Sequence, residues 1–339
     1  MGLTNGHDTR GMPVIIDCDT GIDDALALLY ACASPEMDLV GATCVSGNVG
    51  AQQVARNTLN VLALGGKSDV EVALGREVPL VRPLVIAPET HGPAGVGYAV
   101  LGEPSQPLSE RHAADLLIEE ARKRPGKIML ITLGPLTNLA VALVREPNLP
   151  HLLRGLVMMA GSYRSAGNTA PTTEWNVAVD PEAMQIVLAG WATHSHVPRP
   201  VALGLDVTEK AKMTPEHLAD LRRRAGDPPA SQLLDFIDDA LRFYMEFHSQ
   251  YDGFYGAFIH DALALAAALD PSLIRTQPVS VEVELGGTHT TGETVTDWRH
   301  RWGREPNLDV AVEADIGKFF DRFVERVGML AARQSDVAL

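Results

Sequence analysis

Short apolar runs alternate with longer amphipathic stretches along most of the 339-residue chain. An apolar run at 14–16 precedes a helical pattern at 23–33, and a second run at 39–45 precedes another at 51–64. This alternation is typical of βαβ units, in which crossover helices cover a parallel sheet. We therefore expect an α/β fold with a single open, mostly parallel (mixed) sheet flanked by helices, Rossmann-like, with helical insertions.

The rest of the chain extends this pattern without an internal repeat or a low-complexity linker. Further strands are predicted at 128–133, 156–159, 201–205, 279–285 and 308–312. Further helices are predicted at 136–144, 181–188, 215–224, 231–250, 261–268 and 316–327. We expect one α/β domain over residues 13–330, preceded by a flexible polar tail over residues 1–12.

Composition excludes several classes of function. The formal net charge of -15 disfavours a nucleic-acid partner, because phosphate backbones bind basic surfaces. No run of about 18 apolar residues is present, so no membrane partner is expected. The chain has no apolar signal core near its start, and its cysteines are too few for a secreted disulfide framework: Cys18, Cys32 and Cys44. These features predict a cytoplasmic protein.

The segment VIIDCDTGIDDALAL places four aspartates within eight residues: Asp17, Asp19, Asp23 and Asp24. Carboxylates at this density repel one another unless a cation lies between them. They follow an apolar strand, and functional groups of open α/β sheets gather at the carboxyl ends of strands. Oxygen ligands without histidine or cysteine favour Ca²⁺ or Mg²⁺. If Asp23 and Asp24 only cap a helix, Asp17 and Asp19 are left unexplained.

Two other segments carry candidate functional groups. His260 and Asp261 precede an apolar helix, where they fit either a site or a structural histidine followed by an N-cap. A long polar loop at 161–180 suits the hydroxyls and ring face of a sugar, or is an ordinary turn-rich loop. Its candidate residues are Asn168, Glu174, Trp175 and Asn176. A glycine-rich loop carries His91, a weaker signal.

These segments, in this order, resemble the inosine–uridine-preferring nucleoside hydrolase family from about Pro13 to Val327. The DxDxGxDD motif coupled to a downstream HD pair carries most of the resemblance. It implies Ca²⁺-dependent hydrolysis of the N-glycosidic bond of ribonucleosides to ribose and a free purine or pyrimidine base. It also implies a homodimer or homotetramer with one Ca²⁺ per protomer. The implied Ca²⁺ ligands are Asp19, Asp24, Asp261 and the backbone carbonyl of Leu133.

The resemblance also implies which residues hold the substrate. On the ribose side these are Asp17, Asn48, Met159, Asn168, Glu174 and Asn176. On the base side they are His91 and His260. Tyr244 and His248, one helical turn apart, are expected to approach the base, and Trp175 to stack on it or line the pocket.

The mechanism expected for this chemistry uses an activated water and an oxocarbenium-like ribosyl centre. Asp19 is predicted to be the general base, because it could contact both Ca²⁺ and the water. His260 is predicted to be the general acid that protonates the leaving base, with His91 as second choice. The preferred base stays open.

Two other functions are compatible with parts of the sequence. DCDTG also fits the DxDxT nucleophile motif of haloacid-dehalogenase-type phosphatases, although the later acidic pair that such enzymes need is missing. Asp238 and Asp239 instead lie within a helical pattern. A non-catalytic Ca²⁺-dependent nucleoside- or sugar-binding protein would use the same ligands without turnover.

Overall fold

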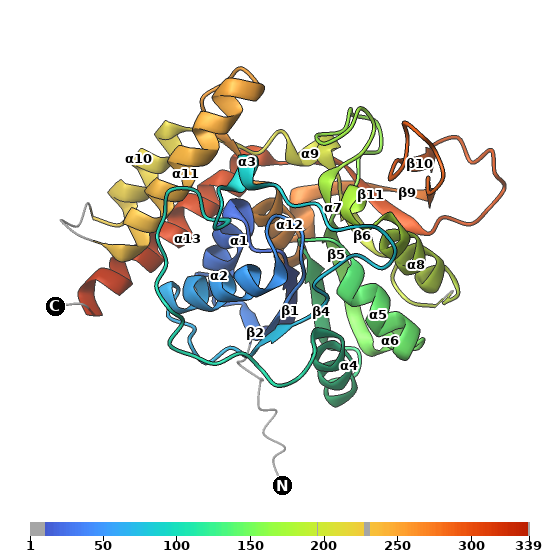
Figure 1. Ribbon diagram of the computed structural model, residues 1–339, viewed down its shortest axis with the longest axis horizontal. Helices are drawn as coiled ribbons and strands as arrows, with labels where there is room; N and C mark the ends of the chain where they lie inside the picture. Colours follow the sequence, from blue (N-terminus) through green and yellow to red (C-terminus); the bar gives the residue numbers. More distant parts are fainter. Residues whose placement is uncertain (1–10, 195, 227–230, 338–339) are drawn as a thin grey trace, which may run out of the picture.

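A sheet of nine strands, counted over the described residues, forms the centre of the protein (Figure 1). The computed structural model describes residues 11–194, 196–226 and 231–337. The strand order is β10-β9-β11-β6-β5-β4-β1-β2-β3. Neighbours from β11 to β3 pair in parallel, whereas β9 pairs antiparallel with both β11 and β10. The predicted mostly parallel, mixed sheet is therefore confirmed.

Seven of the nine strands of the sheet overlap the predicted positions. Their bounds are β1 Met12–Cys18, β2 Met37–Cys44, β3 Val72–Leu74, β4 Ile128–Thr132, β5 Leu153–Met159, β6 Val201–Leu203, β9 Ile274–Val283, β10 Thr294–Asp297 and β11 Leu308–Ala314. A separate antiparallel pair is formed by β7 Lys212–Met213 and β8 Ala257–Phe258. Four strands were not expected from the sequence: β3, β7, β8 and β10.

Fourteen helical segments are assigned within the described residues. They are α1 Ile22–Cys32, α2 Ala51–Leu64, α3 Pro88–His91, α4 Ala113–Lys123, α5 Thr137–Arg145, α6 Leu149–Leu152, α7 Trp175–Val179, α8 Pro181–Ala192, α9 Leu205–Thr208, α10 Pro215–Arg224, α11 Gln232–Tyr251, α12 His260–Leu269, the 3₁₀ turn η1 Pro271–Leu273 and α13 Ile316–Val337. The bounds of α2 and α10 match the prediction, and α13 extends past its predicted end at 327.

Both faces of the sheet are covered because its strands are apolar on both sides. In β1, Val14 and Ile16 belong to the core beneath α1, α2, α11, α12 and α13, whereas Ile15 belongs to the core beneath α4, α5 and α8. Figure 1 shows these helix groups on opposite sides of the strands. Alternate side chains of a strand point to opposite faces, so a continuous apolar run fits a strand that is buried twice.

The topology determines where a ligand can bind. From β1 the chain order runs through β2 and β3 on one side and through β4 and β5 on the other. Open α/β sheets bind ligands at the carboxyl ends of strands where the order reverses, which here lies between β1 and β4. The loops that follow β1, β2, β4 and β5 therefore converge on one edge of the sheet.

The predicted N-terminal tail and the predicted domain bounds are only partly covered by the residues that the structure describes. The predicted tail over residues 1–12 falls mostly outside the described residues, and Met12 already belongs to β1. The single domain over 13–330 stays a prediction. In the part of the chain that the structure describes, no helix combines the length and hydrophobicity needed for a membrane span.

Candidate active site

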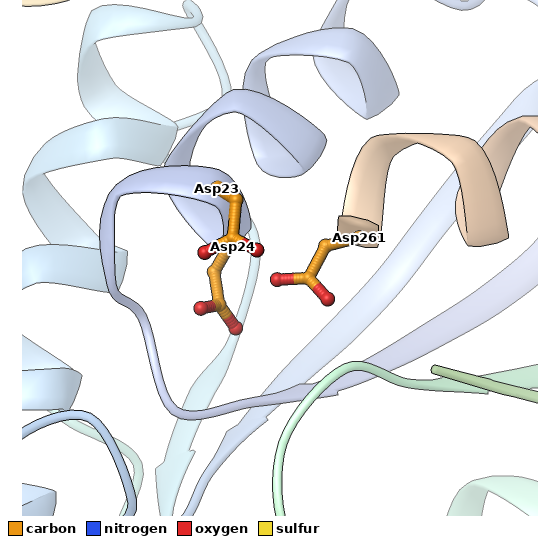
Figure 2. Close-up of side chains that lie close together, drawn as sticks. All are labelled: Asp23, Asp24 and Asp261. Atoms are coloured by element: carbon orange, nitrogen blue, oxygen red, sulfur yellow. The ribbon is translucent and has the colours of Figure 1, made fainter. Parts of the chain in front are cut away.

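Three buried carboxylates meet at the edge of the sheet (Figure 2). Asp23 and Asp24 lie in the first turn of α1, and Asp261 lies in the first turn of α12. One oxygen from each lies within 4.8 Å of the others. Burial, and then repulsion by Asp23 and Asp24, raises the pKa of Asp261 well above its usual value. A divalent cation would remove this repulsion, so the cluster fits a metal site.

Asp19 lies beside this cluster with one oxygen unsatisfied. Its Oδ2 accepts a hydrogen bond from the backbone N–H of Asn48 at 2.7 Å. Its Oδ1 is buried and has no hydrogen-bond partner among the described residues. A Cβ added at Gly134 would lie 2.7 Å from Oδ1, so this oxygen faces the end of β4, next to Leu133. A buried carboxylate oxygen without a donor fits a cation ligand.

The carboxylate of Asp24 is held by three donors, two backbone N–H groups and one side-chain amide. Its carboxylate accepts from the N–H groups of Asp19 at 3.2 Å and Gly21 at 2.9 Å. The side-chain amide of Asn48 donates to it at 3.1 Å. The loop after β1 therefore folds back over the start of α1, which brings Asp19 and Asp24 together as the sequence predicted.

The loop after β5 holds a second group of polar side chains. Glu174 caps α7 by accepting from the N–H groups of Asn176 and Val177, and it also accepts from Gly161. Burial raises the pKa of Glu174, and these backbone donors oppose the shift. The side-chain amide of Asn176 donates to the carbonyl oxygen of Leu133 at 2.6 Å. The loop is therefore an ordered part of the site.

A cavity of about 470 Å³ opens above the carboxylates. Twelve of the predicted site residues line it: Asn48, His91, Leu133, Met159, Asn168, Glu174, Trp175, Asn176, Tyr244, His248, His260 and Asp261. Asp19 and Asp24 are not among the lining residues and are buried. The structure thus gathers segments from both halves of the sequence around a cavity of the size of a small molecule.

Asp17 and Asp23 differ from the sequence-based expectation. Asp17 does not line the cavity, and its Oδ1 accepts from Thr43 at 2.5 Å and from Asn138 at 2.8 Å. Asp17 thus lies between β1, β2 and α5 rather than in the cavity wall, and this position does not support the predicted contact with the ribose. Its Oδ2 is buried and has no hydrogen-bond partner among the described residues. Burial raises its pKa to about 7. Asp23, which was not among the predicted site residues, lines the cavity and belongs to the carboxylate cluster.

Hydrogen bonds assign the protons of two histidines in the cavity. Nδ1 of His91 accepts from the backbone N–H of Ile22 at 3.2 Å, so a neutral His91 carries its proton on Nε2. Nδ1 of His260 lies 2.8 Å from the hydroxyl of Thr208, which itself donates to the Gly204 carbonyl. A neutral His260 therefore carries its proton on Nδ1. Burial lowers the pKa of both histidines to about 3.

Aromatic rings form another wall of the cavity. The rings of Tyr244 and His248 on α11 have centroids 4.5 Å apart, and Tyr244 also contacts His91, with centroids 5.4 Å apart. Phe258, at the end of β8, packs edge-on against His248 with centroids 4.7 Å apart. The cavity thus combines a carboxylate cluster with an aromatic wall, which suits a ligand with a polar part and a flat ring.

Comparison with known proteins identifies the family. The sequence profile described as inosine-uridine preferring nucleoside hydrolase matches residues 14–321. The chain belongs to this family. Similar curated proteins include the pyrimidine-specific ribonucleoside hydrolase RihA of Citrobacter koseri, which is 38% identical over 323 residues, covering 95% of this chain and 99% of that protein. RihA of an Enterobacter species is 37% identical over 325 residues, covering 95% of this chain and 99% of that protein.

Solved structures agree with this assignment. The purine-preferring ribonucleoside hydrolase from Gardnerella vaginalis superposes with a TM-score of 0.87 at 29% identity, covering 95% of this chain and 99% of that one. The plant nucleoside hydrolase PpNRh1 has a TM-score of 0.85 at 30% identity, with 94% and 99% covered. This chain is thus a nucleoside N-ribohydrolase. The phosphatase alternative is wrong, and Asp238 and Asp239 lie within α11.

Proposed function

We propose that this nucleoside hydrolase is Ca²⁺-dependent and binds one ion per protomer through Asp19, Asp24, Asp261 and the carbonyl of Leu133. The observation that carries the proposal is the buried carboxylate cluster together with the unpartnered Oδ1 of Asp19. These ligands are all oxygens, and flexible all-oxygen sites suit Ca²⁺. Asp23 adds a further carboxylate that faces the cavity.

Asp19 is the proposed general base. Its Oδ2 is held by Asn48, whereas the buried Oδ1 has no protein donor among the described residues and would be shared by the ion and the attacking water. When bound, Ca²⁺ would lower the pKa of a nearby water and neutralise the surrounding carboxylates. Asp19 then accepts the proton that the water releases as it attacks the ribosyl carbon.

The ribose is proposed to lie between the carboxylates and the loop after β5. Glu174 and Asn176 lie in the cavity wall. Asn168 is held there because its Oδ1 accepts a hydrogen bond from the backbone N–H of Trp175 at 3.0 Å. This bond leaves the amide of Asn168 free to donate to a sugar hydroxyl. Together with Asn48 and Met159, these groups fix the ring and place acidic oxygens around a developing oxocarbenium-like centre.

The leaving base is proposed to lie against the aromatic wall, near His91 and His260. A neutral His91 presents an Nε2–H that can donate to the base, whereas a neutral His260 has its proton on Nδ1, directed at Thr208. His260 as the general acid, which the sequence predicts, would have to act as a protonated ring. His260→Ala should lower kcat more than it raises KM, and an unchanged kcat would rule out the acid role.

The proposed function is tested with uridine, cytidine, inosine and adenosine, each measured with and without a chelator and after addition of Ca²⁺, Mg²⁺ or Zn²⁺. We expect release of free base that the chelator abolishes and Ca²⁺ restores. Pyrimidine nucleosides are assayed first, because the similar curated proteins at 38% identity are named pyrimidine-specific. Tight nucleoside binding without release of base would instead favour the non-catalytic binding protein.

Self-association and location are further proposals. A homodimer or homotetramer is expected, and light scattering of the purified protein measures it directly. A cytoplasmic location stays a prediction from cysteine usage.

A further inference from the structure

A second cavity, of about 720 Å³, lies between α10 and α13 and shares no lining residue with the active site. Figure 1 shows these two helices side by side. Ile316, Phe320 and Val324 follow one another at intervals of four residues on α13, so they form one apolar face of this cavity. A cavity of this size can hold a small molecule.

Basic side chains outnumber acidic ones around this cavity. The basic residues are Lys210, Lys212, Arg223 and Arg224, and the acidic residues are Asp220, Asp321 and Glu325. Arg223 and Asp220 form an ion pair, so their charges offset each other. The remaining side chains leave a net positive charge, in a chain whose formal net charge is -15. Such a local excess favours an anionic ligand.

The positive charge is concentrated near the start of α13. Lys212 belongs to β7, and Lys210 precedes it by two residues. Arg275 and, to a smaller extent, Lys210 lower the pKa of Glu313, three residues before α13, which places Lys210 near that end of the helix. Glu325 lies more than two helical turns further along α13. A phosphate dianion therefore fits the end of the cavity that the two lysines form.

His217 and Phe320 provide a flat aromatic surface in the same cavity. Their rings stack with centroids 4.1 Å apart and an angle of 27° between the planes. Nδ1 of His217 accepts from the backbone N–H of Thr214 at 3.1 Å, so a neutral ring carries its proton on Nε2. Burial lowers the pKa of His217 below its usual value, which favours this neutral form. A planar ring can pack against these side chains, and Nε2–H can donate to an oxygen of the ligand.

The segment that joins α9 to β7 lies between the two cavities. Glu209 lines the active site, whereas Lys210 and Lys212 line the second cavity. Nζ of Lys212 lies 4.5 Å from the ring centroid of Phe254 and 5.4 Å from that of Phe258. Lys212 also pairs with Phe258 between β7 and β8, and Phe258 lines the active site. A negative charge beside Lys212 would compete with these cation–π contacts and so act on the active-site wall.

We propose that the second cavity binds a nucleoside monophosphate, and that this ligand raises the KM of the active site for its nucleoside substrate. The phosphate group contacts Lys210 and Lys212, and the base packs against His217. A nucleoside monophosphate carries both a dianion and a flat ring, which is the combination that the cavity offers. The enzyme would then cleave nucleosides more slowly where their phosphorylated forms are abundant.

Calorimetric titration with uridine 5′-monophosphate, ribose 5-phosphate and inorganic phosphate separates the possible sources of the phosphate group. We expect the nucleotide to bind with a Kd of about 1 mM or tighter, and the two ligands without a base to bind about tenfold more weakly. Equal affinity for all three would overturn the assignment to a nucleotide, because the base would then make no contact. This measurement does not depend on catalysis, so it stands apart from the proposed dependence on Ca²⁺.

Lys210→Gln tests the position of the ligand. Its affinity for uridine 5′-monophosphate should fall about tenfold, because a charge-assisted hydrogen bond is lost. Its KM without nucleotide should equal that of the wild type, because Lys210 does not line the active site. Lys127→Gln removes the same charge from an exposed turn before β4 and is the matched control, with unchanged affinity. Equal affinity in Lys210→Gln and the wild type would place the nucleotide elsewhere and overturn the proposal.

Lys212→Met tests the coupling between the cavities. It keeps an apolar stem against the rings but removes the cation, so KM should rise without nucleotide and respond little to its addition. In the wild type and in Lys127→Gln, saturating nucleotide should raise KM about threefold. At the same nucleotide concentration Lys210→Gln should show a smaller rise. An unchanged KM in the wild type with the nucleotide bound would overturn the coupling, and no binding up to about 10 mM would overturn the site itself.

Discussion

The side-chain amide of Asn176 lies 2.6 Å from the carbonyl oxygen of Leu133 and 3.1 Å from that of Met159. It therefore joins the start of α7 to the ends of β4 and β5. The Leu133 carbonyl is one of the proposed Ca²⁺ ligands. A residue of the loop that is proposed to bind the sugar thus holds a carbonyl that is proposed to bind the metal.

Asn176→Ala should weaken Ca²⁺ binding about tenfold or more, because loss of a group that orients a ligand typically has this effect. Calorimetric titration of chelator-treated protein measures the affinity. Asn60→Ala is the control, since within the described part of the chain its amide donates to the carbonyls of Arg56 and Gly102, away from the site. Equal Ca²⁺ affinity in Asn176→Ala and the wild type would show that the carbonyl needs no such support.

Asp261→Asn should have opposite effects on stability with and without metal. In chelated protein it removes one of the mutually repelling charges, so Tm should rise by a few degrees. The gain in Tm that Ca²⁺ gives the wild type, through binding to the folded state, should be lost. Thermal unfolding with chelator and with Ca²⁺ measures both effects. A wild-type-sized gain in the variant would remove Asp261 from the ligands.

His91 predicts a dependence of stability on pH. Its pKa is about 3 in the folded protein and 6.5 in the reference state. The unfolded chain therefore binds a proton that the folded one rejects, and stability is lost as pH falls from 6.5 towards 3. His91→Gln lacks this loss. The free energy of unfolding of the wild type, relative to that of the variant, should therefore fall by about 2 kcal/mol between pH 7 and pH 5. Urea unfolding across this range measures it, and parallel curves would contradict it.

Trp175→Phe should separate binding from folding. The indole Nε1 is buried and has no hydrogen-bond partner among the described residues, and Trp175 lines the cavity. Since no protein hydrogen bond is lost, Tm should fall little or not at all. If Nε1 donates to the substrate, KM should rise several-fold. A large drop in Tm with unchanged KM would assign Trp175 to packing alone.

The sequence predicted the parallel core of the fold because each βα unit carries its own periodicity. Two elements that it did not predict have weak local signals: β3 is only three residues long, and β10 is the polar edge segment TVTD. Both are strands because a neighbouring strand offers pairing partners, which a local pattern cannot reveal. The helix α4 was also not predicted, although its local signal is strong: its apolar residues recur three and four apart in AADLLIEEARK.

The candidate site, like the fold, was predicted from the sequence only in part. In a fully extended segment, Asp17 and Asp19 would lie on one face of the strand. In the structure β1 ends at Cys18, so Asp17 lies within the strand and Asp19 lies in the turn beyond it. The sequence also allowed Asp23 to be a capping residue, although the first turn of α1 directs both Asp23 and Asp24 towards Asp261. Strand ends and helix starts, which determine these directions, are the least predictable boundaries.

The carboxylate cluster lies at the amino ends of two helices, α1 and α12. Each such end bears a partial positive charge of roughly half a unit. Together the two helices would offset about one negative charge in the cluster before any ion arrives. We therefore expect a newly synthesised chain to complete its fold without Ca²⁺ and to acquire the proposed ion, together with the activity proposed to depend on it, as a later step.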